Sequence, residues 1–270
     1  MNQVQMHLTI VRHGNTNDNN RWRVAGNTDS PLNSTGQYQA KLVAARLQNE
    51  HFDQVCTSDL SRAYNTAATI VKLNKSFNDE KRIEKHPELR ERHFGVAEKS
   101  MILQHYKNAK KAGFKNRFEM TGFVPEGGES DEDVNRRMSI FVKKLIEKRL
   151  KMENPNWRVL ITSHGITMRE LFTCLVKEHG CSGISDEIIR NKYTLAKSPN
   201  TAVTEFTLNI DRKSGKIVEG KCTLLKCKKH LESSNEIINR IVSYQEKIVY
   251  YFQFFLAIFL YYLSKLGLWS

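Results

Sequence analysis

The sequence predicts an α/β protein, a three-layer α/β/α sandwich with a mostly parallel central sheet. Short β-branched apolar runs alternate with stretches of helical apolar spacing over most of the first 230 residues. This alternation is typical of helices packed on both faces of a parallel sheet. A chain of 270 residues with 40% hydrophobic residues is long enough for one sizeable core. We therefore expect one domain over residues 1–230 and a tail over residues 231–270.

The first expected pair of elements is a buried strand and an amphipathic helix. The run HLTIV predicts a strand that ends near Val11. After a loop rich in turn formers, Ser34 or Thr35 can cap a helix whose apolar residues, up to Leu47, recur at helical spacing.

The next pair is followed by a long polar region. DQVCT predicts a strand, and the following helix spans residues 61–73, with Asp59 as its cap. Residues 74–125 contain a basic helix near residues 100–112 and otherwise lack a clear pattern. We expect this middle region to pass over the sheet without contributing to its core.

The last expected elements are again alternating helices and strands, followed by a hairpin. A helix begins after Ser130, the run RVLIT predicts a strand, and His164 and Gly165 open a further helix. The segments TAVTEFTLNI and KIVEGKCTLLKC, separated by DRKSG, predict a closing hairpin.

Charge and cysteine content narrow the class of protein. The formal net charge of +13 suits solvated helix faces, an anionic membrane surface or a polyanionic small substrate, and no nucleic-acid-binding motif is present.

An odd number of cysteines without short paired spacing argues against a disulfide framework or a zinc site. The N-terminus shows no secretory leader. We expect a cytoplasmic protein. The five cysteines are Cys56, Cys174, Cys181, Cys222 and Cys227.

Two similar segments, LTIVRHGNT and VLITSHGIT, each place a His-Gly pair directly after a predicted strand. In parallel sheets, functional groups gather beyond the carboxyl ends of the strands, where helix N-termini attract anions. Either histidine alone would more often be a packing residue. Together they predict that His13 and His164 lie side by side at one anion-binding crevice.

This arrangement suits phosphoryl transfer. A neutral imidazole at His13 can attack phosphorus, and Arg12, Arg62 and His164 can stabilise the charge on the phosphoryl oxygens. Glu91, in the loop sequence LRERHFG, is the best-placed group to protonate the leaving oxygen and activate water. Taken singly, Arg62 and Glu91 could equally be ordinary surface charges.

The sequence resembles the phosphoglycerate-mutase-like branch of the histidine phosphatase superfamily over about residues 6–228. Six motifs carry the resemblance, in order: RHGNTNDN, GNTDSPLNSTG, TSDLSRAYNTA, LRERHFG, PEGGES and SHG. The resemblance implies that His13 carries the phosphoryl group and that Arg12, Arg62 and His164 form the phosphate pocket. Glu91 would be the proton donor. The chemistry implied requires no metal or cofactor, and the sequence shows no obvious Asp/His ligand cluster.

The resemblance also assigns substrate contacts and exposes two departures. Asn19 matches a phosphate-contacting asparagine, and the N–H of Gly165 and the residue Thr28 complete the predicted substrate-binding set. Asn15 replaces a commoner glutamate, and Lys99 replaces a frequent glycine, where it could add a cation to the substrate mouth.

Within this branch, VPEGGESDEDVNRRM and SPNTAVTEF resemble the TIGAR-like fructose-2,6-bisphosphatases. The resemblance implies a metal-independent phosphatase that hydrolyses fructose 2,6-bisphosphate or a related small anionic phosphoester and thereby regulates glycolysis. Two alternatives remain: a phosphoglycerate mutase or bisphosphoglycerate phosphatase, and a non-catalytic, membrane-tethered scaffold.

The tail contains the apolar segment IVYYFQFFLAIFLYYL, residues 248–263. As a helix it would be roughly 24 Å long, short of the ~30 Å hydrocarbon core of a bilayer, but tyrosines flank it as they flank membrane spans. A membrane anchor on an intracellular membrane, a helix packed on the domain or a partner, and an unusual terminal extension are all compatible with this pattern.

Overall fold

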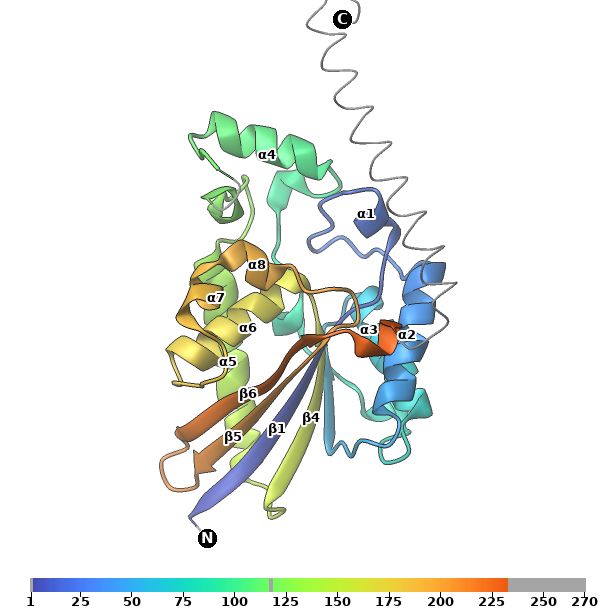
Figure 1. The fold of residues 1–270 in the computed structure, drawn as a ribbon, viewed down its shortest axis with the longest axis vertical. Coiled ribbons are helices and arrows are strands. Elements are labelled where there is room, and N and C mark those ends of the chain that lie inside the picture. The colour runs from blue at the N-terminus through green and yellow to red at the C-terminus, as the bar shows by residue number, and fades with distance from the viewer. Residues whose placement is uncertain (1, 117–118, 233–270) are drawn as a thin grey trace, which may run out of the picture. The chain divides into compact units, whose positions relative to one another are not determined.

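A six-stranded sheet in the order β3-β2-β4-β1-β5-β6 organises the structure (Figure 1). This computed structural model describes residues 2–116 and 119–232. The chain divides into two compact units, residues 1–228 and 229–270, and of the second only α9 (Lys229–Glu232) is described.

The sheet is mostly parallel, as the sequence predicts. Its four parallel strands are β1 (Gln3–Arg12), β2 (Gln54–Thr57), β3 (Glu84–Lys85) and β4 (Asn156–Ser163). The predicted closing hairpin is also confirmed, since β5 (Val203–Asp211) and β6 (Ile217–Cys227) pair antiparallel along the outer edge of β1.

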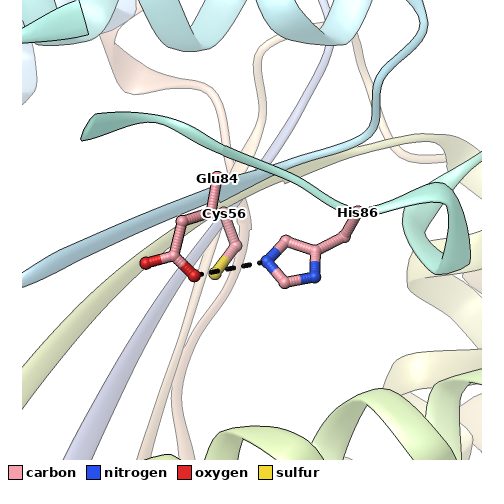
Figure 2. Close-up of side chains that lie close together, drawn as sticks. All are labelled: Cys56, Glu84 and His86. Carbon is pink, nitrogen blue, oxygen red and sulfur yellow. Dashed lines mark ion pairs between the residues drawn. The ribbon is translucent and has the colours of Figure 1, made fainter. Parts of the chain in front are cut away.

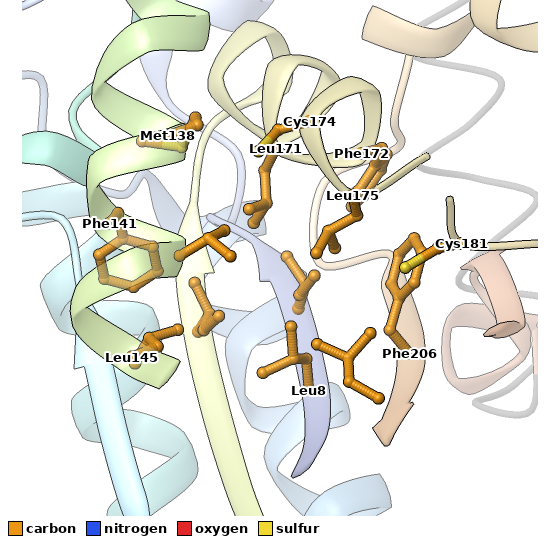
Figure 3. Packing of buried hydrophobic residues seen from close by; sticks show 14 of the residues in the cluster. Leu8, Met138, Phe141, Leu145, Leu171, Phe172, Cys174, Leu175, Cys181 and Phe206 are labelled. Atoms are coloured by element: carbon orange, nitrogen blue, oxygen red, sulfur yellow. The ribbon is translucent and has the colours of Figure 1, made fainter. Parts of the chain in front are cut away.

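Helices cover both faces of the sheet, which completes the predicted three layers (Figure 1). Side chains alternate across a strand, so Ile10 of β1 enters one apolar cluster and Val11 enters the other. Figure 3 shows the first cluster, in which α5 (Asp131–Leu150) and α6 (Gly165–Lys177) pack on β1 and β4. The second cluster lies under α2 (Ser34–Leu47) and α3 (Ser61–Leu73).

The middle region differs from its prediction in two ways. It supplies the edge strand β3, and Phe77, Ile83 and Leu89 enter the apolar clusters, so it does contribute to the core. Its helix α4 (Ile102–Lys111) matches the predicted basic helix. Several short helices were not predicted from the sequence: α1 (Asn17–Asn20), α7 (Asp186–Arg190), α8 (Lys192–Ala196) and the 3₁₀ turns η1 (Glu80–Arg82), η2 (Pro87–Leu89), η3 (Gly95–Ala97) and η4 (Glu119–Gly122).

Two predicted helix caps are wrong. The N-cap of α2 is Asn33, whose side chain accepts the N–H of Gly36, and Ser34 is already inside the helix. Asn33 and the serine after it are both good caps, so the sequence alone could not separate them. The predicted start of a helix after Ser130 is confirmed, because Ser130 is the N-cap of α5 and forms a capping box with Asp133.

Asp59 does not cap α3 either. The N-cap of α3 is Leu60, which makes no capping side-chain bond. Asp59 instead accepts two hydrogen bonds from the Arg90 guanidinium, at 2.7 and 2.5 Å. This pair joins the start of α3 to the loop that carries Glu91, a contact too remote in sequence to be seen from local pattern.

In residues 2–116 and 119–232, no helix combines the length and the apolar character needed to cross a membrane. The apolar segment 248–263 lies outside the described residues. The predictions for that segment therefore stay predictions.

Candidate active site

The two His-Gly pairs lie at the carboxyl ends of adjacent parallel strands. Arg12, the last residue of β1, pairs in register with Ser163, the last residue of β4. The N–H of His13 donates to the carbonyl oxygen of Ser163 at 3.0 Å. The imidazole rings of His13 and His164 have centroids 5.0 Å apart. The predicted side-by-side placement is therefore confirmed.

The His13 imidazole is buried and oriented by the backbone of the next residue, Gly14. Its Nδ1 lies 2.7 Å from the carbonyl oxygen of Gly14, and a carbonyl can only accept, so we assign the ring proton to Nδ1. Burial lowers the His13 pKa well below its ordinary value, and the nearby charges of Arg62 and Arg12 lower it further. The result is a neutral ring with an unprotonated Nε2.

The His164 imidazole is also buried, with both ring nitrogens engaged. Its Nδ1 accepts from Nε of Arg62 at 3.2 Å, and its Nε2 lies 2.9 Å from Oγ of Ser58. Burial, followed by the charges of Arg62, His13 and Arg12, lowers its pKa well below the ordinary value. His164 thus holds Arg62 in place as a neutral acceptor.

Arg62 is buried at the start of α3 and fixes the facing loop. Its Nη1 donates to the carbonyl oxygen of Thr28 and its Nη2 to that of Gly26, each at 2.7 Å. Arg12 is anchored in a comparable way, through a bond from Nη1 to the carbonyl oxygen of Ser198. Because each guanidinium is bonded to fixed backbone, neither has to be ordered when an anion binds.

Glu91 lies on a loop, as predicted, and is held by the N-terminus of α6. Its carboxyl oxygens accept from the N–H groups of Thr167 at 3.2 Å and Ile166 at 3.3 Å, and from that of Arg92 at 2.9 Å. From the sequence, the first N–H groups of this helix, that of Gly165 in particular, were expected to face the substrate. Two of its N–H groups serve Glu91 instead.

A cavity of about 250 Å³ opens in front of these groups. Predicted residues that line it are His13, Arg12, Arg62, Glu91 and Asn19, whereas His164, Gly165 and Thr28 do not. Among its lining residues, Glu91 is the single carboxylic acid, and the apolar part includes Val24, Phe94, Ile102 and Met120. The arginine and lysine side chains that line it are Arg12, Arg23, Arg62, Arg92, Arg169 and Lys197.

Predicted residues outside the cavity still support its wall. Oγ1 of Thr28 donates to Glu98 at 3.1 Å, while its carbonyl oxygen holds Arg62. Asn15 is buried and accepts a 2.6 Å bond from Asn33. Lys99 does not line the cavity. Its φ of +64° instead explains why a glycine is common at this position.

Several residues that support the active-site side chains were not predicted from the sequence. Besides Ser58, these include a buried charge network in which Arg92 (3.3 Å) and Arg169 both bond to Asp131. Nδ2 of Asn200 donates to the carbonyl oxygen of His13 at 2.9 Å. The segment SPNTAVTEF contains Asn200 and was already notable, but the partners of Arg92, Arg169 and Asp131 are set by tertiary contacts that no local pattern reveals.

Two groups of side chains in the described part of the chain could hold a metal ion: Cys56 with Glu84 and His86, and Cys174 with Glu178 and His179. Neither group lines the cavity. The cavity itself therefore presents two histidines, His13 and His105, several cationic side chains and one acid. This set suits the binding and transfer of a phosphoryl group.

Comparison with known proteins agrees with this class of site. The chain matches the histidine phosphatase superfamily (branch 1) over residues 8–191 and belongs to that family. It is 32% identical to fructose-2,6-bisphosphatase TIGAR B of Danio rerio over 232 residues, covering 76% of this chain and 87% of the relative.

Two further similarities concern the sequence and the fold. It is 32% identical over 165 residues to the probable phosphoglycerate mutase GpmB of Photorhabdus laumondii, covering 60% of this chain and 71% of the relative. The fold is similar to that of mycobacterial glucosyl-3-phosphoglycerate phosphatase, with a TM-score of 0.66, 23% identity, and coverage of 83% of this chain and all of the other. The family match and the sequence relatives support a phosphatase without fixing its substrate, and the solved structure supports the fold alone.

Proposed function

We propose that this chain is a metal-independent phosphatase that hydrolyses a small phosphoester through a phosphohistidine at His13. The observation that carries the proposal is the bond between Nδ1 of His13 and the carbonyl oxygen of Gly14. It leaves Nε2 as the nucleophile, in a cavity that Arg12 and Arg62 also line.

The proposed reaction has two steps. Nε2 of His13 attacks phosphorus, the bond to the leaving oxygen breaks, and Glu91 gives that oxygen a proton. A water then attacks the phosphohistidine while Glu91 takes back one of its protons, which releases phosphate and restores His13. Arg12 and Arg62 stabilise the charge on the phosphoryl oxygens in both steps.

For the substrate, we propose fructose 2,6-bisphosphate or a similar sugar bisphosphate, and hence a role in regulating glycolysis. Charge supports this choice. Asp131 pairs with Arg92 and Arg169, and Glu170 pairs with Arg169 as well, while Arg23 and Lys197 add two exposed cationic side chains to the cavity lining. A second anionic group on the substrate would be attracted to them. The similarity to TIGAR B points the same way.

We also propose a cytoplasmic location, consistent with five free cysteines. Membrane association through residues 248–263 is a separate possibility that the proposed chemistry does not require. A non-catalytic scaffold is disfavoured because the nucleophile, both arginines and the acid line one cavity.

The test is chemical. The protein is incubated with fructose 2,6-bisphosphate labelled at the 2-phosphate and quenched in base, and we expect an acid-labile phosphoprotein. His13→Ala should abolish both the adduct and turnover, whereas His51→Ala, an exposed histidine, should leave them unchanged. Normal turnover by His13→Ala would refute the mechanism. Faster transfer of the label to monophosphoglycerate than to water would instead favour a mutase.

A further inference from the structure

A second cluster of reactive side chains lies on the sheet edge formed by β2 and β3. Cys56 of β2 pairs in register with Glu84 of β3, and the N–H of His86 donates to the carbonyl oxygen of Thr57 at 2.8 Å. Because side chains alternate along a strand, Glu84 and His86 point to the same face of the sheet. Figure 2 shows the thiol, the carboxylate and the imidazole converging.

The spacing within this cluster is close but leaves one nitrogen unsatisfied. The candidate ligand atoms of the three residues all lie within 4.8 Å of one another. Nε2 of His86 is 3.6 Å from Oε2 of Glu84, too far for a hydrogen bond, and this buried nitrogen has no hydrogen-bond partner. An edge contact with Phe141, with ring centroids 5.3 Å apart, restrains the imidazole.

We propose that Cys56, Glu84 and His86 form a binding site for a transition-metal ion of the Zn²⁺ class. Zinc bonds of roughly 2.0–2.3 Å in tetrahedral geometry separate two ligand atoms by about 3.3–3.8 Å, which matches the separation of Nε2 and Oε2. The metal would replace the thiol proton of Cys56, which is released to solvent. Water would fill the fourth position.

The surroundings orient Glu84 for this role. Nε2 of Gln54 donates to Oε2 at 2.9 Å, and Nζ of Lys148 contacts Oε1 at 2.6 Å. The amide fixes the orientation of the carboxylate, as outer hydrogen bonds commonly do at metal sites. The lysine opposes the metal, because it places a positive charge next to the same carboxylate.

The chain provides its own matched comparison in Cys174, Glu178 and His179. Oγ of Ser139 lies 2.9 and 2.7 Å from the two carboxylate oxygens of Glu178 and donates its single proton to this carboxylate. None of the three side chains in this second group has a buried nitrogen that lacks a hydrogen-bond partner. The same residue types are therefore present, but the buried imidazole nitrogen without a partner, which distinguishes the first group, is missing from the second.

The proposed metal site adjoins the candidate active site along the chain and is independent of the proposed function. Cys56 lies two residues before Ser58, which contacts His164, and His86 precedes the loop that carries Glu91. The proposal concerns binding alone, so its test needs no substrate and its outcome does not depend on turnover.

The first experiment adds Co²⁺ to the chelator-treated full chain and records the absorption spectrum. We expect a thiolate-to-cobalt charge-transfer band and the visible bands of a tetrahedral ion, and Zn²⁺ should displace both. Absence of the charge-transfer band, or its persistence in Cys56→Ser with normal circular dichroism, would overturn the proposal.

Competition with a zinc indicator then measures affinity for each variant. His86→Ala and Glu84→Gln, both at partly exposed side chains, should weaken Zn²⁺ binding more than about tenfold, because losing even an outer partner costs roughly 10- to 100-fold. His179→Ala should change nothing, and Lys148→Met should tighten binding. Equal affinities for His86→Ala and the unmodified chain would refute the site, as would a loss in His179→Ala.

Discussion

Replacing Arg62 by lysine keeps a positive charge at the start of α3 but removes the fork of donors that fixes the site. The arginine makes three bonds, to Nδ1 of His164 at 3.2 Å and to the carbonyl oxygens of Thr28 and Gly26 at 2.7 Å each. One ammonium cannot reach all three acceptors. If two bonds are lost at about 1.5–3 kcal/mol each, the total cost is about 3–6 kcal/mol.

This cost should divide between stability and catalysis. We expect kcat/KM of Arg62→Lys to fall by at least about 10²-fold, which corresponds to about 2.7 kcal/mol, with the remainder seen as a lower free energy of unfolding in urea. The matched control is Arg158→Lys, at an exposed ion pair 3.5 Å from Glu50, which should change neither quantity. If Arg62→Lys keeps kcat/KM within about tenfold and its unfolding free energy is unchanged, then the three bonds do not organise the site.

Three further predictions concern stability, each measured by urea denaturation. Lys99→Gly should raise the free energy of unfolding by about 1 kcal/mol, because it removes a side chain from left-handed backbone; a decrease would refute this. The lowered pKa values of His13 and His164 mean that the unfolded chain binds protons first as the pH falls. Stability should therefore be full above about pH 7 and decline below about pH 6.5, by up to ~1.4 kcal/mol per pH unit for each histidine, and a flat profile between pH 7.5 and 5.5 would contradict it. Asp131→Asn should cost about 3–5 kcal/mol, because it leaves two buried arginines without their shared carboxylate; a loss below about 1 kcal/mol would show that the network is already satisfied elsewhere.

The layers and the placement of the two histidines were predictable because they follow from period and topology. Once His13 and His164 are assigned to the ends of parallel strands, the geometry of the sheet brings them together without further information. Arg62 and Glu91 were predictable by the same reasoning, since each follows a strand or loop that reaches this edge. What the sequence analysis predicted less well is which groups each side chain contacts.

The missed features depend on contacts between remote segments. Aspartate is a common helix N-cap, but the carboxylate of Asp59 accepts two charged hydrogen bonds from Arg90 and is therefore not available to cap α3. β3 has two residues, too few for a periodic signal. The convergence of Cys56 with His86 depends on strand register, so cysteine spacing, which argued against a zinc site, could not indicate it.

The attachment of Glu91 to the start of α6 has a consequence for how this architecture can diversify. The bonds from Ile166 and Thr167 tie the acid to helix α6 of the sandwich, at a point in the chain before Phe94, Ile102 and Met120, which line the cavity. The segment that follows Glu91 can therefore be exchanged while the carboxyl group of Glu91 keeps its position relative to His13 and His164. Grafting the corresponding segment from a relative should transplant substrate preference and leave the phosphoryl-transfer apparatus intact.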